Sequence, residues 1–114
     1  MPGPSLSLEV KQEGNATVVF LSGDIDASSL NDFQSAVEPL CNVEGAQVVL
    51  ECAALNYVNS AGLGLLFALS RACKTNGGQL LMCGVRSKVK NVIHVLGLDN
   101  LLELRDERSR PESD

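Results

Sequence analysis

Near the N-terminus, hydrophobic and polar residues alternate with the period of two that is typical of a β-strand with one solvent-exposed face. Leu6, Leu8 and Val10 are the apolar members of this pattern. After a turn at residues 13–15, a nearly continuous β-branched and aromatic run covers residues 16–21. The two segments predict an antiparallel hairpin whose second strand lies nearer the middle of a sheet.

Three later segments repeat their apolar residues at steps of three and four, which is the spacing of an amphipathic helix. The predicted helices cover residues 27–40, 61–75 and 87–96. Asp26, Ser28 or Ser29 can cap the first helix, and Ser60 occupies the cap position of the second. The glycines after the second helix mark its end, because glycine tolerates the left-handed conformation that often follows a helix.

Apolar runs too short for helices separate these segments and predict the remaining strands, at residues 47–52, 80–84 and 101–104. The order is therefore β-β-α-β-α-β-α-β. Helices that alternate with buried strands predict an α/β fold with a mixed, largely parallel β-sheet that opens with an N-terminal hairpin. With 114 residues we expect a single domain with its core at residues 5–105, followed at 106–114 by a disordered acidic tail without apolar residues.

The composition, with 45% hydrophobic residues and a net charge of −5, is that of an ordinary soluble domain. Its acidic balance lacks the basic surface that binding to nucleic acid or to an anionic membrane requires. The longest apolar stretch, residues 65–69, is far shorter than the roughly 20 residues of a membrane-spanning helix. Since the N-terminus also lacks the basic head and apolar run of a secretory signal, we expect a cytoplasmic protein with no membrane insertion.

The residues available for chemistry do not favour an enzyme. Four cysteines are spaced too far apart for a C-x-x-C metal or redox motif, and we expect them to be small core hydrophobes: Cys41, Cys52, Cys73 and Cys83. Gly62 and Gly64 lack the further residues of a phosphate-binding loop, and Ser60 lies outside the G-x-S-x-G pattern of hydrolases. His94, the single histidine, is expected at the surface. We therefore predict no metal, no cofactor and no catalytic residue.

The segment that opens the second helix points to a binding surface. Gly62 and Gly64 lie in its first turn, where each costs up to about 1 kcal/mol of helix stability relative to alanine, so bare backbone is required there. The apolar residues of this helix form two stripes, and only one stripe can face the sheet. Unless it is covered within the molecule, the second stripe is a surface for a partner protein: Leu65, Ala68, Leu69 and Ala72.

A phosphate on Ser60 would suit this position. It would add roughly −1.5 to −2 charges at the positive end of the helix dipole, where backbone N–H groups are available. The helix should tolerate the modification, whereas a partner docked across the glycines would meet new bulk and charge. Phosphorylation could therefore switch binding without altering the fold.

At three places, residues 21–26, 48–55 and 57–64, the sequence resembles the STAS domain of the anti-sigma factor antagonist family, which are cytoplasmic bacterial switch proteins. The resemblance extends over residues 5–105. The third segment is the most specific, because the family's loop reads D-S-[ST]-G-[LI]-G and this chain reads N-S-A-G-L-G from Asn59 to Gly64.

The resemblance implies that the unphosphorylated protein binds an anti-sigma factor that is also a serine kinase of the GHKL type, and so frees the sigma factor. The kinase would phosphorylate Ser60 and release the antagonist until a phosphatase resets it. Asp26 matches the acidic residue that lies near this loop in the family and contacts the partner. The expected partner-binding residues are Asp24, Asp26, Asn59, Ala61, Gly62, Leu63, Gly64 and Leu65. We expect a monomer or a weak dimer.

Two residues of the loop depart from the family pattern. Asn59 stands in place of the usual aspartate, which removes a negative charge beside the acceptor. Ala61 replaces the usual second serine or threonine, so Ser60 is the only hydroxyl of the loop. The alternative interpretation is a constitutive STAS interaction subunit of a transporter or larger signalling complex that is not phosphorylated.

Overall fold

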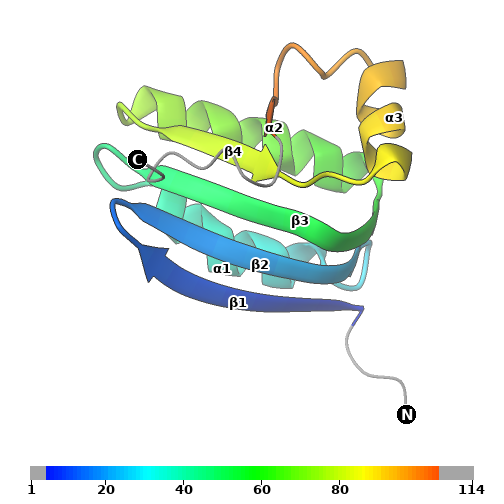
Figure 1. Ribbon diagram of the computed structural model, residues 1–114, viewed down its shortest axis with the longest axis horizontal. Coiled ribbons are helices and arrows are strands. Elements are labelled where there is room, and N and C mark those ends of the chain that lie inside the picture. Colours follow the sequence, from blue (N-terminus) through cyan, green and yellow to red (C-terminus); the bar gives the residue numbers. More distant parts are fainter. Residues whose placement is uncertain (1–4, 106–114) are drawn as a thin grey trace.

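The computed structural model describes residues 5–105, and the predicted acidic tail at 106–114 lies outside the described residues. The element order matches the sequence prediction (Figure 1). The strands are β1 Leu6–Glu13, β2 Ala16–Ile25, β3 Gln47–Val58, β4 Gln79–Cys83 and β5 Glu103–Arg105. The helices are α1 Leu30–Cys41, α2 Ser60–Thr75 and α3 Ser87–Val95.

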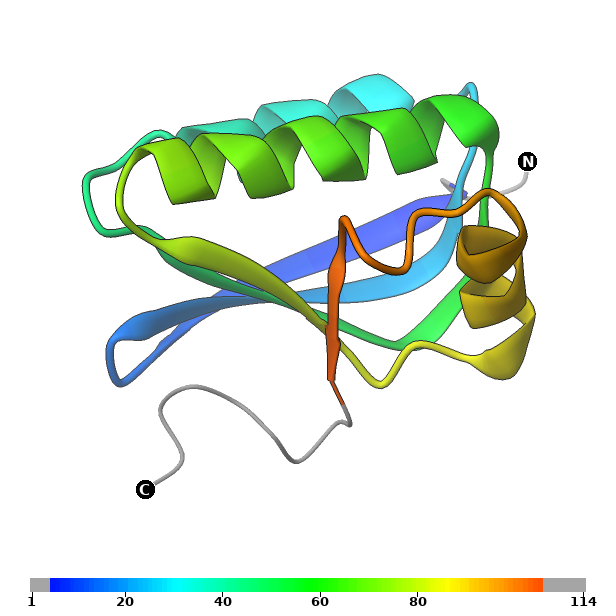
Figure 2. The ribbon, with the colours of Figure 1, turned by 90° about the horizontal axis from the view of Figure 1, so that it is seen from above.

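The strands form one sheet in the order β1-β2-β3-β4-β5, so that each strand lies beside its neighbour in the sequence. β1 and β2 are antiparallel, and the other three pairs are parallel, which confirms the predicted hairpin and mixed sheet. Each helix connects two parallel strands by a right-handed crossover. When successive crossovers move in the same direction across the sheet, their helices lie on the same face. Accordingly α1 and α2 lie side by side on the same face, and α3 lies at one end (Figure 2).

β3 is the central strand, and its first half is buried on both faces. Val48 and Leu50 belong to the main core between the sheet and the helices. Val49 alternates with them and belongs to a smaller apolar cluster on the opposite face, together with Val18 and Leu81. The prediction of a buried strand at residues 47–52 is therefore confirmed for this half.

The second half of β3 extends beyond the predicted strand, which ended at Cys52. β3 continues to Val58 and stays paired with β2, but its register shifts between Phe20 and Ser22 and again between Gly23 and Asp24. At each shift β3 contributes one residue more than β2, which is the signature of a β-bulge. The bulges break the period-two alternation of apolar residues, and for this reason the sequence pattern placed the end of the strand too early.

The start of α1 also differs from the prediction, because the helix begins at Leu30 and not at residue 27. Ser29 occupies the N-cap position, yet its side chain makes no capping hydrogen bond. Instead the Ser29 hydroxyl donates to the carbonyl oxygen of Asp24 at 2.8 Å and accepts from the backbone N–H of Asp26 at 3.0 Å. This buried serine therefore fixes the loop between β2 and α1.

The second apolar stripe of α2 is mostly covered within the molecule. Leu69 is buried in the main core, and Leu65 and Ala72 are half-buried against it. Asn76 ties the end of α2 to that of α1 by donating from Nδ2 to the carbonyl oxygen of Cys41 at 3.1 Å. Only Ala68 of this stripe is exposed, so the stripe is covered within the molecule and does not form a partner surface.

Candidate functional site

The candidate site forms where the carboxyl ends of β2 and β3 meet. Asp24 pairs with Tyr57 and Ile25 with Val58 in the parallel register. One step further, the backbone N–H of Asn59 donates to the carbonyl oxygen of Ile25 at 2.9 Å. The loop that follows β2 and the first turn of α2 are therefore neighbours, although more than thirty residues separate them in the chain.

Asn59, and not Ser60, caps helix α2. Its side-chain Oδ1 accepts a hydrogen bond from the backbone N–H of Gly62 at 2.7 Å, and its carbonyl oxygen accepts from the N–H of Leu63 at 3.0 Å. The extended backbone of Asn59, with φ −80° and ψ 174°, is the conformation that an N-cap requires. The prediction of Ser60 as the cap is wrong by one residue, because the amide of Asn59 already performs this role.

Ser60 is the first residue of α2, and it is exposed. Within the described residues 5–105 its hydroxyl has no hydrogen-bond partner. The backbone N–H groups of Ser60 and Ala61 likewise make no hydrogen bond to the described part of the chain, as expected for the first turn of a helix. The loop therefore presents one free hydroxyl beside two free N–H donors.

Asp26 is held in place by a network of serines. Its Oδ1 accepts hydrogen bonds from the hydroxyl of Ser28 at 2.8 Å, the backbone N–H of Ser28 at 3.0 Å and the hydroxyl of Ser5 at 3.1 Å. These bonds, with that from the Ser28 hydroxyl first, lower the pKa of the Asp26 carboxyl. The structure thus brings a fixed, ionised carboxylate to the loop that lies beside the start of α2.

The two glycines of the first turn serve different purposes. A Cβ on Gly62 would come within 2.8 Å of methyl groups of Ile25 and Val58, so this glycine lets α2 pack closely on the ends of β2 and β3. A Cβ on Gly64 would meet nothing within 4 Å. The fold explains the bare backbone at Gly62 and gives no reason for it at Gly64.

The structure separates the expected partner-binding residues into exposed and buried ones. Leu63 is only 1% exposed because its side chain lies in the main core, so it is not accessible on the surface. Gly62 is buried for the packing reason given above. The residues that remain accessible, fully or in part, are Asp24, Asp26, Asn59, Ser60, Ala61, Gly64 and Leu65.

The sequence pattern did not indicate that α3 also contributes residues to the end of the molecule where the candidate site lies. The Arg86 guanidinium, at the start of α3, donates to the side-chain Oδ1 of Asn56 on β3. Tyr57, the next residue of β3, is 48% exposed. The signal for it in the sequence is the cluster of basic residues at 86–90 in an otherwise acidic chain.

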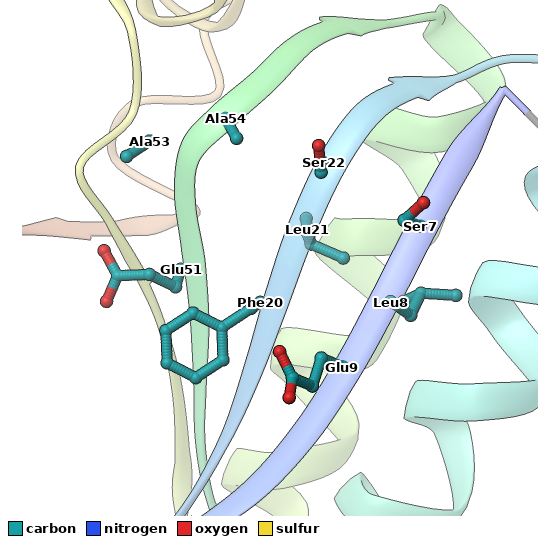
Figure 3. A pocket seen from close by; sticks show the side chains of 9 residues that line it. All are labelled: Ser7, Leu8, Glu9, Phe20, Leu21, Ser22, Glu51, Ala53 and Ala54. Atoms are coloured by element: carbon teal, nitrogen blue, oxygen red, sulfur yellow. The ribbon is translucent and has the colours of Figure 1, made fainter.

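A shallow depression of about 250 Å³ lies on the sheet face opposite α1 and α2. Figure 3 shows the carboxylates of Glu9 and Glu51 on either side of the Phe20 ring. Its lining comes from β1, β2 and β3: Ser7, Leu8, Glu9, Phe20, Leu21, Ser22, Glu51, Ala53 and Ala54. The depression lies along the middle of the strands, away from their carboxyl ends, and is separate from the Ser60 loop.

Other chemistry finds little support among residues 5–105. All four cysteines are buried, and burial raises the pKa of the Cys52 thiol, so that this side chain stays protonated. Within the described range, no group of three or more histidine, cysteine, aspartate or glutamate residues could hold a metal ion. Over the same range, none of the helices has the length and apolar character needed to cross a membrane.

Comparisons with known proteins identify the family of this chain. The sequence matches the STAS domain over residues 7–110, and the chain therefore belongs to the STAS domain family. The anti-sigma-B factor antagonist of Listeria monocytogenes is 21% identical over 103 residues, which is 90% of each chain.

Two solved structures show the same fold. An anti-sigma factor antagonist from Mycobacterium paratuberculosis gives a TM-score of 0.75 at 22% identity, covering 90% of this chain and 87% of that one. The Bacillus cell fate determinant SpoIIAA in its phosphorylated form gives a TM-score of 0.67 at 16% identity, covering 88% of this chain and 90% of that one. At these identities the likeness concerns the fold.

The two glycines should respond in opposite ways to alanine. We expect Gly62→Ala to lower the free energy of unfolding by about 1–3 kcal/mol, because the added methyl overpacks against two stiff β-branched side chains. Gly64→Ala should raise it by up to about 1 kcal/mol, because alanine is the better helix former and has room. Urea denaturation of both variants measures the difference, and equal effects would contradict the packing assigned to Gly62.

The cap can be tested at Asn59. We expect Asn59→Ala to lower the free energy of unfolding by about 1 kcal/mol, and Asn59→Asp to leave it within about 0.5 kcal/mol of the wild type, since both asparagine and aspartate are good caps. Thermal and urea unfolding of the two variants provides the measurement. If the alanine variant were as stable as the wild type, the hydrogen bond to Gly62 would not contribute.

Proposed function

We propose that this protein is an anti-sigma factor antagonist that is switched by phosphorylation of Ser60. In its unphosphorylated form it binds an anti-sigma factor that is also a serine kinase of the GHKL type, and so releases the sigma factor. Phosphorylation ends this interaction, and a phosphatase restores it. The similarity to proteins named anti-sigma factor antagonists, which covers 90% of this chain, supports the proposal.

The observation that carries the proposal is the state of the Ser60 hydroxyl. A kinase can reach only a side chain that is exposed and not already engaged, and Ser60 meets both conditions at the first position of α2. Ala61 leaves the loop without a second hydroxyl, so no neighbouring acceptor competes. The structure of the relative SpoIIAA in a phosphorylated form gives this chemistry a precedent in the same fold.

In the proposed reaction this chain is the substrate, and the kinase is the enzyme. The Ser60 oxygen forms a bond to the γ-phosphorus of the ATP held by the kinase, while the bond between that phosphorus and ADP breaks. The hydroxyl proton passes to a base on the kinase. This chain therefore needs no catalytic residue of its own, and it would act in the cytoplasm, where ATP and the sigma factor are found.

The fold should accept the phosphate. The free N–H groups of Ser60 and Ala61 and the positive end of the α2 dipole favour an anion at this place. Because Asn59 caps the helix with an uncharged amide, the phosphate would have no carboxylate as its immediate neighbour in the sequence. The substitution of the family's aspartate thus keeps the capping function and lowers the local negative charge.

The phosphate would change the charge of the accessible surface around Ser60. It would add roughly −1.5 to −2 charges beside the ionised Asp26, so that the surface offered to a partner becomes strongly negative. Gly64 lies on this surface, and nothing in the fold requires its missing side chain. A partner that approaches the backbone of α2 closely would explain why glycine is present there.

The phosphorylation site can be tested against a matched serine. Ser87 is the first residue of α3 and is exposed, as Ser60 is in α2. Incubation with the cognate anti-sigma kinase and ATP should add one phosphate to the wild type and to Ser87→Ala, and none to Ser60→Ala, as measured by intact mass. Equal incorporation in Ser60→Ala would show that the site is wrong.

The charge switch makes a separate prediction for affinity. We expect Ser60→Asp to weaken binding to the kinase at least tenfold, because a carboxylate reproduces part of the phosphate's charge, and Ser60→Asn to weaken it less. Calorimetric titration of the two variants, which differ by one charge at similar size, measures the effect. Unchanged affinity in Ser60→Asp would instead favour a constitutive STAS subunit of a transporter or larger complex.

A further inference from the structure

An apolar groove lies between the carboxyl end of β3 and helix α3. Its volume is about 160 Å³, which suits a single bulky side chain. Its lining is almost wholly apolar apart from one amide, one hydroxyl and one ammonium group: Asn56, Tyr57, Val58, Leu63, Lys88, Val89 and Val92. Figure 2 shows that α3 and the start of α2 lie at the same end of the molecule.

The apolar surface continues outside the groove along α3. Val92 is 41% exposed, and Val95 and Leu96, three and four residues further on, are 72% and 52% exposed. Val92 and Val95 lie on one face of α3, and Leu96 is the C-cap residue that follows directly. Scattered exposed apolar residues are ordinary, but a row that leads into a groove is typical of an interaction site.

The charge around the groove is opposite to that of the molecule as a whole. The chain has a net charge of −5, yet residues 85–98 contain no aspartate or glutamate. Arg86, Lys88 and Lys90 lie in this stretch, and all three are exposed. The first acid beyond it, Asp99, is paired with His94 at 2.7 Å. A basic rim therefore borders an apolar groove on an acidic protein.

We propose that this groove binds an acidic segment of a partner protein, which inserts one bulky aliphatic or aromatic side chain between Tyr57 and Val92. The carboxylates of that segment face Arg86, Lys88 and Lys90, which supplies the charge complementarity. The concave shape selects a protruding side chain, because the flat surface of a bilayer cannot enter it. The proposal does not depend on whether Ser60 is phosphorylated.

A photo-crosslinking experiment in the native cells tests the proposal. The full chain carries p-benzoylphenylalanine at position 92, or at position 43 as a control. Val43 suits the control because it is similarly exposed, at 56%, and its loop lies at the opposite end of the molecule from α3 (Figures 1 and 2). We expect position 92 to cross-link to a protein segment of net negative charge that contains a bulky apolar residue. Position 43 should not give this product.

A synthetic peptide that spans the cross-linked segment then measures affinity. We expect Val92→Glu to weaken its binding at least tenfold, Val43→Glu to leave it unchanged, and added salt to weaken the wild-type interaction. Lys88→Glu, an exposed change that leaves the apolar groups in place, should also weaken binding and serves if Val92→Glu does not fold. Insensitivity of the peptide affinity to Lys88→Glu would overturn the proposal.

The other outcomes also decide the question. A cross-link to a basic or uncharged segment, to a second copy of this chain, or to no protein at all would overturn the proposal. Co-sedimentation with vesicles of phosphatidylglycerol and phosphatidylcholine in equal parts, lost in Val92→Glu, would assign the surface to a membrane instead. Because phosphate incorporation at Ser60 is measured separately, failure of the groove and failure of the phosphorylation switch are distinguishable.

Discussion

The parallel pairing of β3 with β2 beyond the end of β4 is the constraint on which the candidate site depends. It brings Val58 beside Ile25 and lets the N–H of Asn59 bond to the Ile25 carbonyl oxygen. Without the two bulges, the extra residues of β3 could not be absorbed while the strands remain in register. The same pairing sets where α2 begins, and it therefore places Ser60 beside the loop that carries Asp26.

The sequence pattern predicted most of the fold because burial imposes periodicity. The hairpin, the central strand and the three helices all follow from apolar residues at steps of two, three and four. The second half of β3 was not predicted, because Ala53 and Ala54 are consecutive exposed residues at a bulge and break the alternating pattern of a strand. The cap was misassigned for a different reason: asparagine and serine are equally good caps, and only the backbone conformation distinguishes their positions.

Within the loop, the residues that hold the fold and those that face outward alternate closely. Gly62 and Leu63 fix the first turn of α2 against the strands, and Asn59 closes its first hydrogen bonds. Ser60 and Gly64 do not hold the first turn of α2 in place. The sequence predicts that the loop as a whole is functional. The role of each residue follows only from the packing in the structure, because neighbouring positions of a helix turn point in different directions.

The two charged surfaces at this end of the molecule differ in how a phosphate would affect them. The Asp26 side is acidic and would become more so on phosphorylation of Ser60, whereas the rim of the α3 groove is basic. The groove is lined in part by Val58 and Leu63, which flank the loop that carries Ser60, so the two surfaces are neighbours. Electrostatic interactions between exposed groups fall off over a Debye length of about 8 Å at physiological salt, and the phosphate therefore acts most strongly on the groups nearest to Ser60. Under the two proposals, the modification would weaken a partner bound at the first surface, whereas the basic rim that an acidic segment in the groove requires would still be present.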